Sequence, residues 1–154
     1  MSPENAGPSI HASAVLIGAR ALLIRGPSGS GKSELVFRLI EAGRMGALPF
    51  TRLVADDRTL LEACHGRLLA RPAPALRGLL EVRGLGIRRM AYEDAAVVGL
   101  ALDFESDHEN RIPRESERST AILGISIPRI AVLSVGAALQ RLLAWRLTQP
   151  LRVD

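Results

Sequence analysis

The chain has 154 residues, of which 47% are hydrophobic and 23% charged, a balance that predicts one globular domain and excludes wholesale disorder. The net charge of +4 permits an anionic partner, but the basic residues are dispersed and aromatic residues make up 3%, which disfavours nucleic-acid binding. Residues 1–8 lack the features of a signal peptide and no apolar run reaches about 18 residues, so we expect a cytoplasmic protein without a membrane span. The single cysteine, Cys64, excludes an internal disulfide and is expected to be buried.

The first half of the sequence alternates strand and helix patterns. Apolar runs at residues 14–17 and 21–24 are separated by Gly18-Ala19-Arg20, which predicts a hairpin. Apolar residues then follow a helical period from Lys32 to Gly43. Residues 51–55 predict a short strand.

The second half continues the mixture. A helix is expected over residues 136–147, with Ser134 as its cap and Pro150 beyond its end. The other expected elements are a hairpin over residues 59–69 turning near His65 and Gly66, a loop over 71–76, a strand over 79–83, a buried strand over 95–102, and a solvated loop over 108–118. The order of elements predicts a mixed α/β fold.

A phosphate-binding loop is the strongest motif. Residues 26–33 read GPSGSGKS and match G-x-x-x-x-G-K-[ST] without a mismatch, between an apolar strand and an amphipathic helix. The glycines allow successive N–H groups to point inward, and the helix adds the positive end of its dipole. The residues expected to bind a nucleotide are Gly26, Pro27, Ser28, Gly29, Ser30, Gly31, Lys32 and Ser33. Lys32 is expected to neutralise the phosphates, and the Ser33 hydroxyl to bind Mg²⁺.

Lys32 is also the only lysine among the 20 basic residues of the chain. A compact ammonium can enter a tight phosphate loop, whereas a planar guanidinium cannot. Coding bias explains the nineteen arginines, but it does not explain where the one exception lies.

Acidic residues at strand ends are candidates for metal binding and proton transfer. Asp56 and Asp57 follow the strand over residues 51–55; one could hold the metal, and the other could take a proton from an attacking hydroxyl. A solvated surface turn is the alternative. Asp103, at the end of the strand over 97–102, is a rival metal ligand, and spacing alone does not decide between them.

The segment from Glu81 to Ile87 combines an acid, a base and a flexible turn. Glu81 could bind a hard cation and Arg83 could face phosphate, beside Gly84 and Gly86. An ordinary hairpin turn explains the same residues. For His11, which precedes the first strand, a structural role is the alternative to a catalytic one.

Together these segments resemble the catalytic domain of HPr kinase/phosphorylase, which modifies a serine of the phosphocarrier protein HPr. The matching residues are 9–11, 26–34, 53–58 and 79–87, in the order that the family shows. The Glu-x-Arg-Gly-Leu-Gly-Ile stretch is the specific part. The resemblance implies a phosphate-loop α/β fold of the HPr kinase and phosphoenolpyruvate carboxykinase type, with residues 1–154 as a single catalytic domain and residues 1–8 as a flexible N-terminus.

The resemblance also implies the cofactors, the partners and the site residues. ATP and Mg²⁺ are the expected cofactors, an HPr-like carrier is the expected substrate, and a cytoplasmic hexamer is the expected assembly. The implied roles are His11 as an active-site histidine, Lys32 as the phosphate-binding lysine, Asp56 as the acid that accepts the serine proton and returns it in the reverse reaction, Ser33, Asp57 and Glu81 as magnesium ligands, and Arg129 as the active-site arginine.

The sequence departs from the family pattern in three places. The family's N-terminal domain is expected to be absent, residues 44–50 form an additional stretch, and the residues after Ile127-Pro128 are apolar and lack glycine. Because that last region is tied to phosphorolysis in the family, we expect the reverse reaction to be weak. The leading prediction is an ATP- and Mg²⁺-dependent serine protein kinase. A small-molecule kinase and a non-catalytic ATP-sensing module are the alternatives, and the lack of an N-K-x-D signature disfavours a GTPase.

Overall fold

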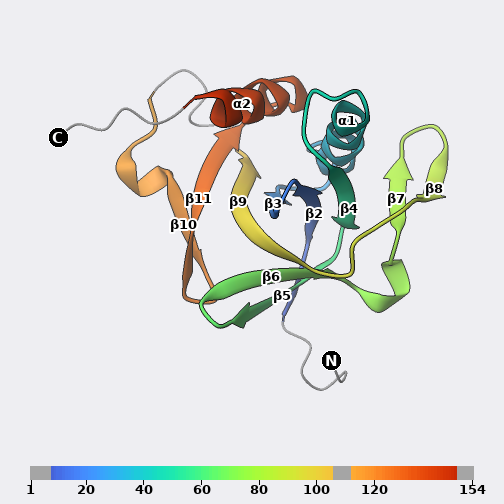
Figure 1. The fold of residues 1–154 in the computed structure, drawn as a ribbon, viewed down its shortest axis with the longest axis horizontal. Coiled ribbons are helices and arrows are strands. Elements are labelled where there is room, and N and C mark those ends of the chain that lie inside the picture. Colours follow the sequence, from blue (N-terminus) through green and yellow to red (C-terminus); the bar gives the residue numbers. More distant parts are fainter. Residues whose placement is uncertain (1–7, 106–111, 149–154) are drawn as a thin grey trace.

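Residues 8–105 and 112–148 are described by the computed structural model, which shows a curled nine-stranded sheet with two helices on one face (Figure 1). The strands of this sheet are β1 (Ser9–Ile10), β2 (Ala12–Ile17), β3 (Arg20–Arg25), β4 (Thr51–Ala55), β5 (Thr59–Cys64), β6 (Arg67–Pro72), β9 (Ala96–Phe104), β10 (Ser119–Ile122) and β11 (Ile125–Val132). The helices are α1 (Lys32–Arg44) and α2 (Val135–Leu147). A separate two-stranded sheet is formed by β7 (Leu79–Val82) and β8 (Gly86–Arg89). The predicted mixed α/β fold is confirmed.

The strand order places the ends of several strands at one edge of the sheet. The order is β1-β5-β6-β9-β3-β2-β4, and β11 also pairs with β9. β9 is parallel to β3 and β11, whereas β2 is antiparallel to both β3 and β4. The carboxyl ends of β3, β4, β9 and β11 therefore lie at the same edge as the start of β2. Ligands of open α/β sheets bind at such an edge.

The core has two parts because the sheet buries both of its faces. In β3, Leu22 and Ile24 belong to the cluster under α1 and α2, whereas Leu23 belongs to the cluster on the opposite side. That second cluster includes Leu61 of β5 and Leu68 of β6. In Figure 1, strands β5 and β6 curl beneath the other strands of the sheet. Successive side chains of a strand point to opposite faces of the sheet, which explains why neighbouring residues of β3 belong to different clusters.

Helix α1 forms as the periodicity predicts. Its buried residues are Lys32, Leu35, Val36, Leu39 and Ile40, which lie on one face of a 3.6-residue helix. The helix ends at Arg44, one residue beyond the expected stop at Gly43. A Cβ at Gly43 would lie 2.7 Å from the Cβ of Thr51, so this glycine is needed for the close approach of β4.

The expected hairpin near residue 65 is confirmed, but the loop after it starts later than predicted. His65 and Gly66 form the turn between β5 and β6. β6 continues to Pro72, which pairs with Thr59, so the expectation that residues 71 and 72 are loop is wrong. Cross-strand pairing with β5 extends the strand despite the proline at its end. The buried strand expected over residues 95–102 is β9, and it extends far enough to include Asp103.

The hairpin of β10 and β11 has no counterpart among the expected elements. Its turn is at Leu123 and Gly124, and Pro128 lies within β11. Most of its side chains are exposed or half-buried, so the apolar pattern is weak, and a proline argues against a strand. Pro128 is tolerated because the pairing of β11 with β9 begins only at Arg129. Of the loop expected over 108–118, residues 108–111 lie outside the described residues, and Glu115–Glu117 form one 3-10 turn.

Helix α2 begins where its cap predicts. The N–H of Ala137 donates to the Ser134 hydroxyl at 3.1 Å, and the helix starts at Val135, one residue earlier than expected. Pro150, the expected stop, lies outside the described residues.

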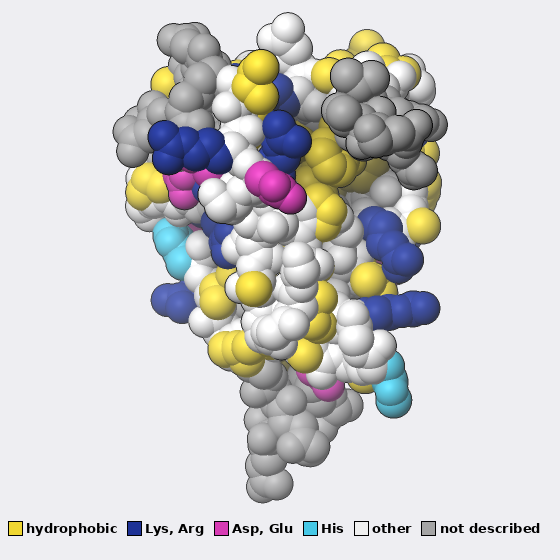
Figure 2. Space-filling model, turned by 90° about the vertical axis from the view of Figure 1, so that its left-hand side faces the viewer, with side chains coloured by type: hydrophobic (Ala, Val, Ile, Leu, Met, Phe, Trp, Pro, Cys, Tyr) yellow, Lys and Arg dark blue, Asp and Glu magenta, His cyan; other side chains and the backbone are white. Residues whose placement is uncertain are grey.

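The surface agrees with the dispersed basic charge of the sequence. On the face in Figure 2, Lys and Arg side chains are scattered among hydrophobic and uncoloured ones. Within the part of the chain that the structure describes, no helix is long and apolar enough to span a membrane. Cys64 is half-buried at the end of β5, so the expectation of a buried cysteine is wrong; the strand ends at a surface turn, where burial is incomplete.

Candidate functional site

The phosphate loop connects the end of β3 to the start of α1 and depends on its glycines. Gly29 and Gly31 have φ angles of 81° and 108°, a region that favours glycine. A Cβ at Gly31 would lie 2.7 Å from Val135 of α2, and one at Gly26 would lie 2.9 Å from Phe104 of β9. The loop is therefore packed tightly on one side, whereas the Cβ position of Gly29 has open space around it.

Lys32 is enclosed by this loop. Its Nζ donates to the carbonyl oxygen of Gly26 at 2.8 Å and to that of Pro27 at 3.0 Å. The residue is only 7% exposed. Two of the three ammonium donors thus hold the loop in shape, and the charge lies among the backbone groups that would surround a phosphate.

The start of α1 offers further donors to an anion. Gly31 is the cap residue, and no side chain accepts from the first amides of the helix, which lack intrahelical partners. The Ser30 hydroxyl is buried and has no hydrogen-bond partner within the described part of the chain. Together with Lys32, these unused donors fit the phosphates of a nucleotide.

Asp56 is the acid at the centre of the site. Its Oδ1 accepts from the hydroxyls of Ser13 at 2.7 Å and Ser33 at 2.8 Å, and its Oδ2 accepts from Ser33 at 2.9 Å and from the N–H of Glu81 at 3.2 Å. The residue is only 6% exposed. The alternative of a solvated surface turn is therefore wrong for Asp56. Its carboxylate links β2, α1, β4 and the start of the β7–β8 hairpin.

Asp57 points the other way and is exposed. Its φ of 66° lies in the left-handed region, which aspartate enters more readily than most residues. The two adjacent acids therefore separate: Asp56 is buried, and Asp57 accepts from the Nε2 of His11 at the surface. His11 thus lies beside the carboxyl end of β4, not in the core, and it reaches the site through Asp57.

Ser13 contacts this site but was not among the residues that the sequence singled out. It is fully buried, donates to Asp56, and accepts from the N–H of Asp57 at 3.3 Å. A serine in the middle of an otherwise apolar strand was the available signal, since a buried hydroxyl requires a partner.

Glu81 and Arg83 belong to the β7–β8 hairpin. A hairpin turn is the alternative explanation that the sequence offers for these residues. Gly84, in the turn, and Gly86, the first residue of β8, have φ angles of 86° and 90°. Glu81, Arg83, Gly84 and Gly86 are exposed. The contact of the Glu81 N–H with Asp56 places the start of the hairpin beside the phosphate loop. Arg83 lies in the turn of the hairpin.

Hydroxyl and carboxylate oxygens are the ligand types that Mg²⁺ prefers, but the structure does not gather all of the expected ligands around Asp56. The Ser33 hydroxyl contacts Asp56, Glu81 contacts it through the backbone N–H, and the Asp57 carboxylate pairs with His11 at the surface. Among the described residues, no group of three or more His, Cys, Asp or Glu side chains could hold a metal on its own. A magnesium ion here would therefore need phosphate oxygens and water as further ligands.

Asp103, the rival metal ligand, is occupied by arginines. Arg25 donates to its two carboxylate oxygens at 2.7 and 2.8 Å, and Arg129 donates to Oδ2 at 2.5 Å. Two guanidinium groups already neutralise this carboxylate, which is unsuited to a cation. Arg25 directly precedes Gly26, so the pair fixes the start of the phosphate loop to β9 and β11.

Arg129 lies in β11 and is held away from the loop. Its side chain is 11% exposed, and it also binds Glu105 at 2.7 Å and the carbonyl oxygen of Glu117 at 3.1 Å. Burial lowers the pKa of Arg129, but the hydrogen bonds and charges of Glu105 and Asp103 outweigh it, so that the pKa is raised. These partners lie outside the phosphate loop, and Arg129 is connected to it through Asp103 and Arg25.

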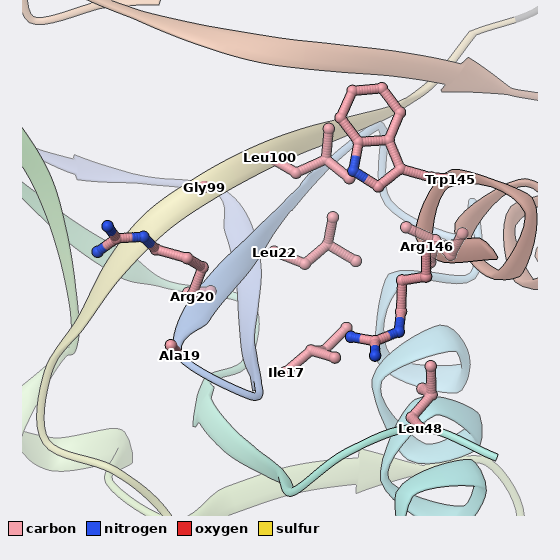
Figure 3. Close-up of a pocket in the computed structure, with 11 residues that line it drawn as sticks. Ile17, Ala19, Arg20, Leu22, Leu48, Gly99, Leu100, Trp145 and Arg146 are labelled. Atoms are coloured by element: carbon pink, nitrogen blue, oxygen red, sulfur yellow. The ribbon is translucent and has the colours of Figure 1, made fainter. Parts of the chain in front are cut away.

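A hollow of about 270 Å³ lies elsewhere, between the β2–β3 turn and the end of α2. Figure 3 shows Trp145 near Leu100, and the guanidinium of Arg146 near Ile17. The lining is mostly apolar and includes none of the site residues expected from the sequence. The residues that the structure does bring together are those of the phosphate loop, Asp56, Asp57, His11 and Glu81.

Comparison with protein families gives one match that covers most of the chain. Residues 5–143 match the model of the HPr Serine kinase C-terminal domain. This range includes the phosphate loop, both aspartates, Glu81 and Arg129.

Individual proteins agree with that match. The chain is 36% identical over 135 residues to an HPr kinase/phosphorylase of Streptococcus thermophilus, covering 80% of the chain and 41% of that protein. It is 36% identical over 136 residues to one of Streptococcus equi subsp. zooepidemicus, with the same shares covered. The chain thus spans about two fifths of the length of these curated relatives. The HPr(Ser) kinase/phosphatase structure of Coxiella burnetii superposes with a TM-score of 0.72 at 24% identity, over 90% of this chain and 95% of that one, so the fold is shared.

Proposed function

Since the chain belongs to the HPr serine kinase C-terminal domain family, we propose that it is a catalytic domain that transfers phosphate from ATP to a serine of an HPr-like phosphocarrier protein. The observation that supports this most directly is the contact of the Ser33 hydroxyl with both carboxylate oxygens of Asp56. It places a buried carboxylate at the mouth of a phosphate loop. A kinase needs its proton acceptor in that place.

Asp56 is proposed to accept the proton of the attacking serine. General bases of this kind contribute about 10²- to 10⁴-fold to a rate. Ser13 and the N–H of Glu81 donate to the carboxylate, so it keeps its orientation when Ser33 turns toward another ligand. In the reverse direction, the same carboxyl group would return the proton.

The phosphate loop is proposed to bind and neutralise the triphosphate. The donors proposed for this are Lys32, which the loop encloses, the amides at the start of α1, which have no side-chain cap, and the Ser30 hydroxyl, which has no partner in the described part of the chain. Stabilisation of phosphate charge dominates phosphoryl transfer. Ser33, Asp57 and Glu81 are the residues that would hold Mg²⁺. When bound, the ion supplies additional neutralisation of the phosphate oxygens.

His11 and Arg129 take supporting roles in this proposal. His11 orients Asp57 through the contact between their side chains. Arg129 fixes Asp103, which fixes Arg25 at the start of the loop. We further propose that the protein works in the cytoplasm as an oligomer, with residues 1–154 as a single catalytic domain.

The reverse reaction, phosphorolysis of the phosphorylated carrier, is proposed to be weak. In this chain, the segment after Pro128 is strand β11, and Arg129 is paired with Asp103 and Glu105. An arginine committed to two carboxylates is a poor ligand for free inorganic phosphate. Incubation of phosphorylated carrier with inorganic phosphate measures this directly, and a reverse rate equal to the forward rate would refute the proposal.

The experiment that tests the kinase proposal combines purified protein, ATP, Mg²⁺ and an HPr-type carrier, and it measures the intact mass of the carrier. One added phosphate, absent when the acceptor serine is replaced by alanine, is the expected result. Nucleotide binding without any modified carrier would favour the sensing module. Consumption of ATP with small hydroxylated molecules, but not with the carrier, would favour the small-molecule kinase.

A further inference from the structure

The β7–β8 hairpin presents an unpartnered face beside the candidate transfer site. Antiparallel pairing matches Glu81 with Ile87 and Leu79 with Arg89, so these four side chains lie on one face. Leu80 and Arg88 form a pair on the other face, which includes the buried Leu80. We refer to Glu81, Ile87 and Arg89, with the turn residue Leu85, as the outer face of the hairpin.

The β7 edge of the hairpin borders the site, because the backbone of Glu81 contacts Asp56. The Glu81 N–H donates to Asp56 and therefore points away from β8. Glu81 and Ile87 are thus a non-hydrogen-bonded pair, the arrangement in which facing side chains lie closest. Ile87 is consequently the immediate neighbour of an acid proposed to hold Mg²⁺. Arg89 lies roughly 7 Å farther along the strand.

This face has the composition of a binding surface. Leu85 is 68% exposed and Ile87 is 64% exposed, although both are large apolar residues. Arg83, Arg88 and Arg89 are exposed, and none of them makes an ion pair within the described part of the chain. The hairpin therefore carries three arginines against the single carboxylate of Glu81. Exposed apolar side chains beside uncompensated charge are typical of protein interaction sites.

We propose that the outer face of the hairpin docks the acceptor protein, through an apolar contact at Leu85 and Ile87 and a carboxylate contact at Arg89. The occupant is a carrier protein whose surface around the acceptor serine has an apolar residue and an acidic group. A small acceptor at Asp56 would not extend to Arg89. The proposal rests on the proposed function, since it assigns the surface that positions the serine for that reaction.

The hairpin supplies its own matched control. Arg88 and Arg89 are adjacent, exposed and equal in charge, but they lie on opposite faces of β8. Arg89→Glu and Ile87→Ser are expected to raise the KM for the carrier at least about tenfold, with kcat and the Kd for ATP within about twofold. Arg88→Glu is expected to change the KM by less than about threefold. Calorimetric binding of a carrier whose acceptor serine is alanine should weaken in the same two variants.

The outcomes separate the docking proposal from the kinase proposal. A wild-type protein that leaves the carrier unmodified would refute the proposed function itself. A wild-type protein that modifies the carrier, with equal KM changes for Arg88→Glu and Arg89→Glu or with losses confined to kcat, would refute docking alone. A change in native mass of the Arg89→Glu protein would show that the face binds a second copy of the chain, and this too would overturn the proposal.

Discussion

Ser33 donates its hydroxyl to both carboxylate oxygens of Asp56, at 2.8 and 2.9 Å. The contact joins the first turn of α1 to the residue after β4, across 23 positions in the chain. It follows from the topology, because β3 and β4 both end at the edge where α1 begins. The proposed chemistry depends on this one relationship and on the groups that maintain it.

Ser13→Ala removes one of the donors that hold Asp56. Because the carboxylate stays buried with one partner fewer, we expect the free energy of unfolding to fall by about 1–3 kcal/mol. We also expect transfer to the carrier to slow by about tenfold. Urea unfolding and a carrier phosphorylation assay measure the two effects. Ser126→Ala, at an exposed position of β11, is the control and should change neither; equal effects of both variants would contradict the role given to Ser13.

Lys32→Arg keeps the charge but not the shape. The Nζ of Lys32 bonds to two carbonyl oxygens inside the loop, and a planar guanidinium cannot occupy that position without displacing the backbone. We expect loss of ATP binding by calorimetry and of transfer, while the thermal unfolding midpoint of the free protein shows that it is still folded. An active Lys32→Arg protein would mean that coding bias, and not loop geometry, explains the single lysine.

Gly31→Ala is expected to lower the free energy of unfolding by more than the strain of a positive φ angle alone would. Gly31 and Gly46 both have positive φ angles, of 108° and 81°, but only at Gly31 would a Cβ meet another side chain, at 2.7 Å from Val135. Gly46→Ala therefore measures the cost of the backbone alone, about 1 kcal/mol. We expect Gly31→Ala to cost more than this in urea unfolding and to weaken ATP binding. Adding Val135→Ala should restore part of the loss; no rescue would mean that the contact with α2 is unimportant.

Arg129→Met tests the ion-pair network behind the loop. Asp103 is 6% exposed and keeps Arg25 as a partner when Arg129 is replaced, so we expect the free energy of unfolding to fall by about 1.5–3 kcal/mol, the contribution of a hydrogen bond to a charged group. The pKa of Arg129 is raised in the folded protein. Its contribution to the free energy of unfolding is therefore fully present below the ordinary pKa of arginine, and it is lost only as pH rises through the still higher pKa of the folded state. The destabilisation measured by urea unfolding should therefore be constant between about pH 6 and 9. A loss of transfer without any loss of stability would contradict the positioning role and favour direct contact with the phosphates.

Much of the site could be predicted from the sequence because local patterns determine it. The phosphate loop, the period of α1 and the acids after β4 are short-range features, and the structure has them where they were expected. That Asp56 is buried and Asp57 exposed could not be predicted, because it depends on the left-handed conformation of Asp57 and on contacts from β2 and β7.

The parts that the sequence did not predict depend on long-range pairing. β11 contains a proline and few buried residues, and it is a strand because β9 and β10 pair with its two edges. The pairing then brings Arg129 to Asp103, a residue 26 positions away, and so changes Asp103 from a possible metal ligand into the partner of two arginines. Ser13 was missed because one hydroxyl in an apolar strand does not reveal its partner.

Asp56→Asn is the most direct test of the account. The amide keeps the size of the side chain and can still bind Ser13 and Ser33, so the protein should fold and bind ATP, but it cannot accept the serine proton. The decisive measurement is the intact mass of an HPr-type carrier after incubation with ATP, Mg²⁺ and either protein. We predict one added phosphate with the wild-type protein and a rate at least about 10²-fold lower with Asp56→Asn. Equal rates of phosphate addition by the two proteins would contradict the central claim.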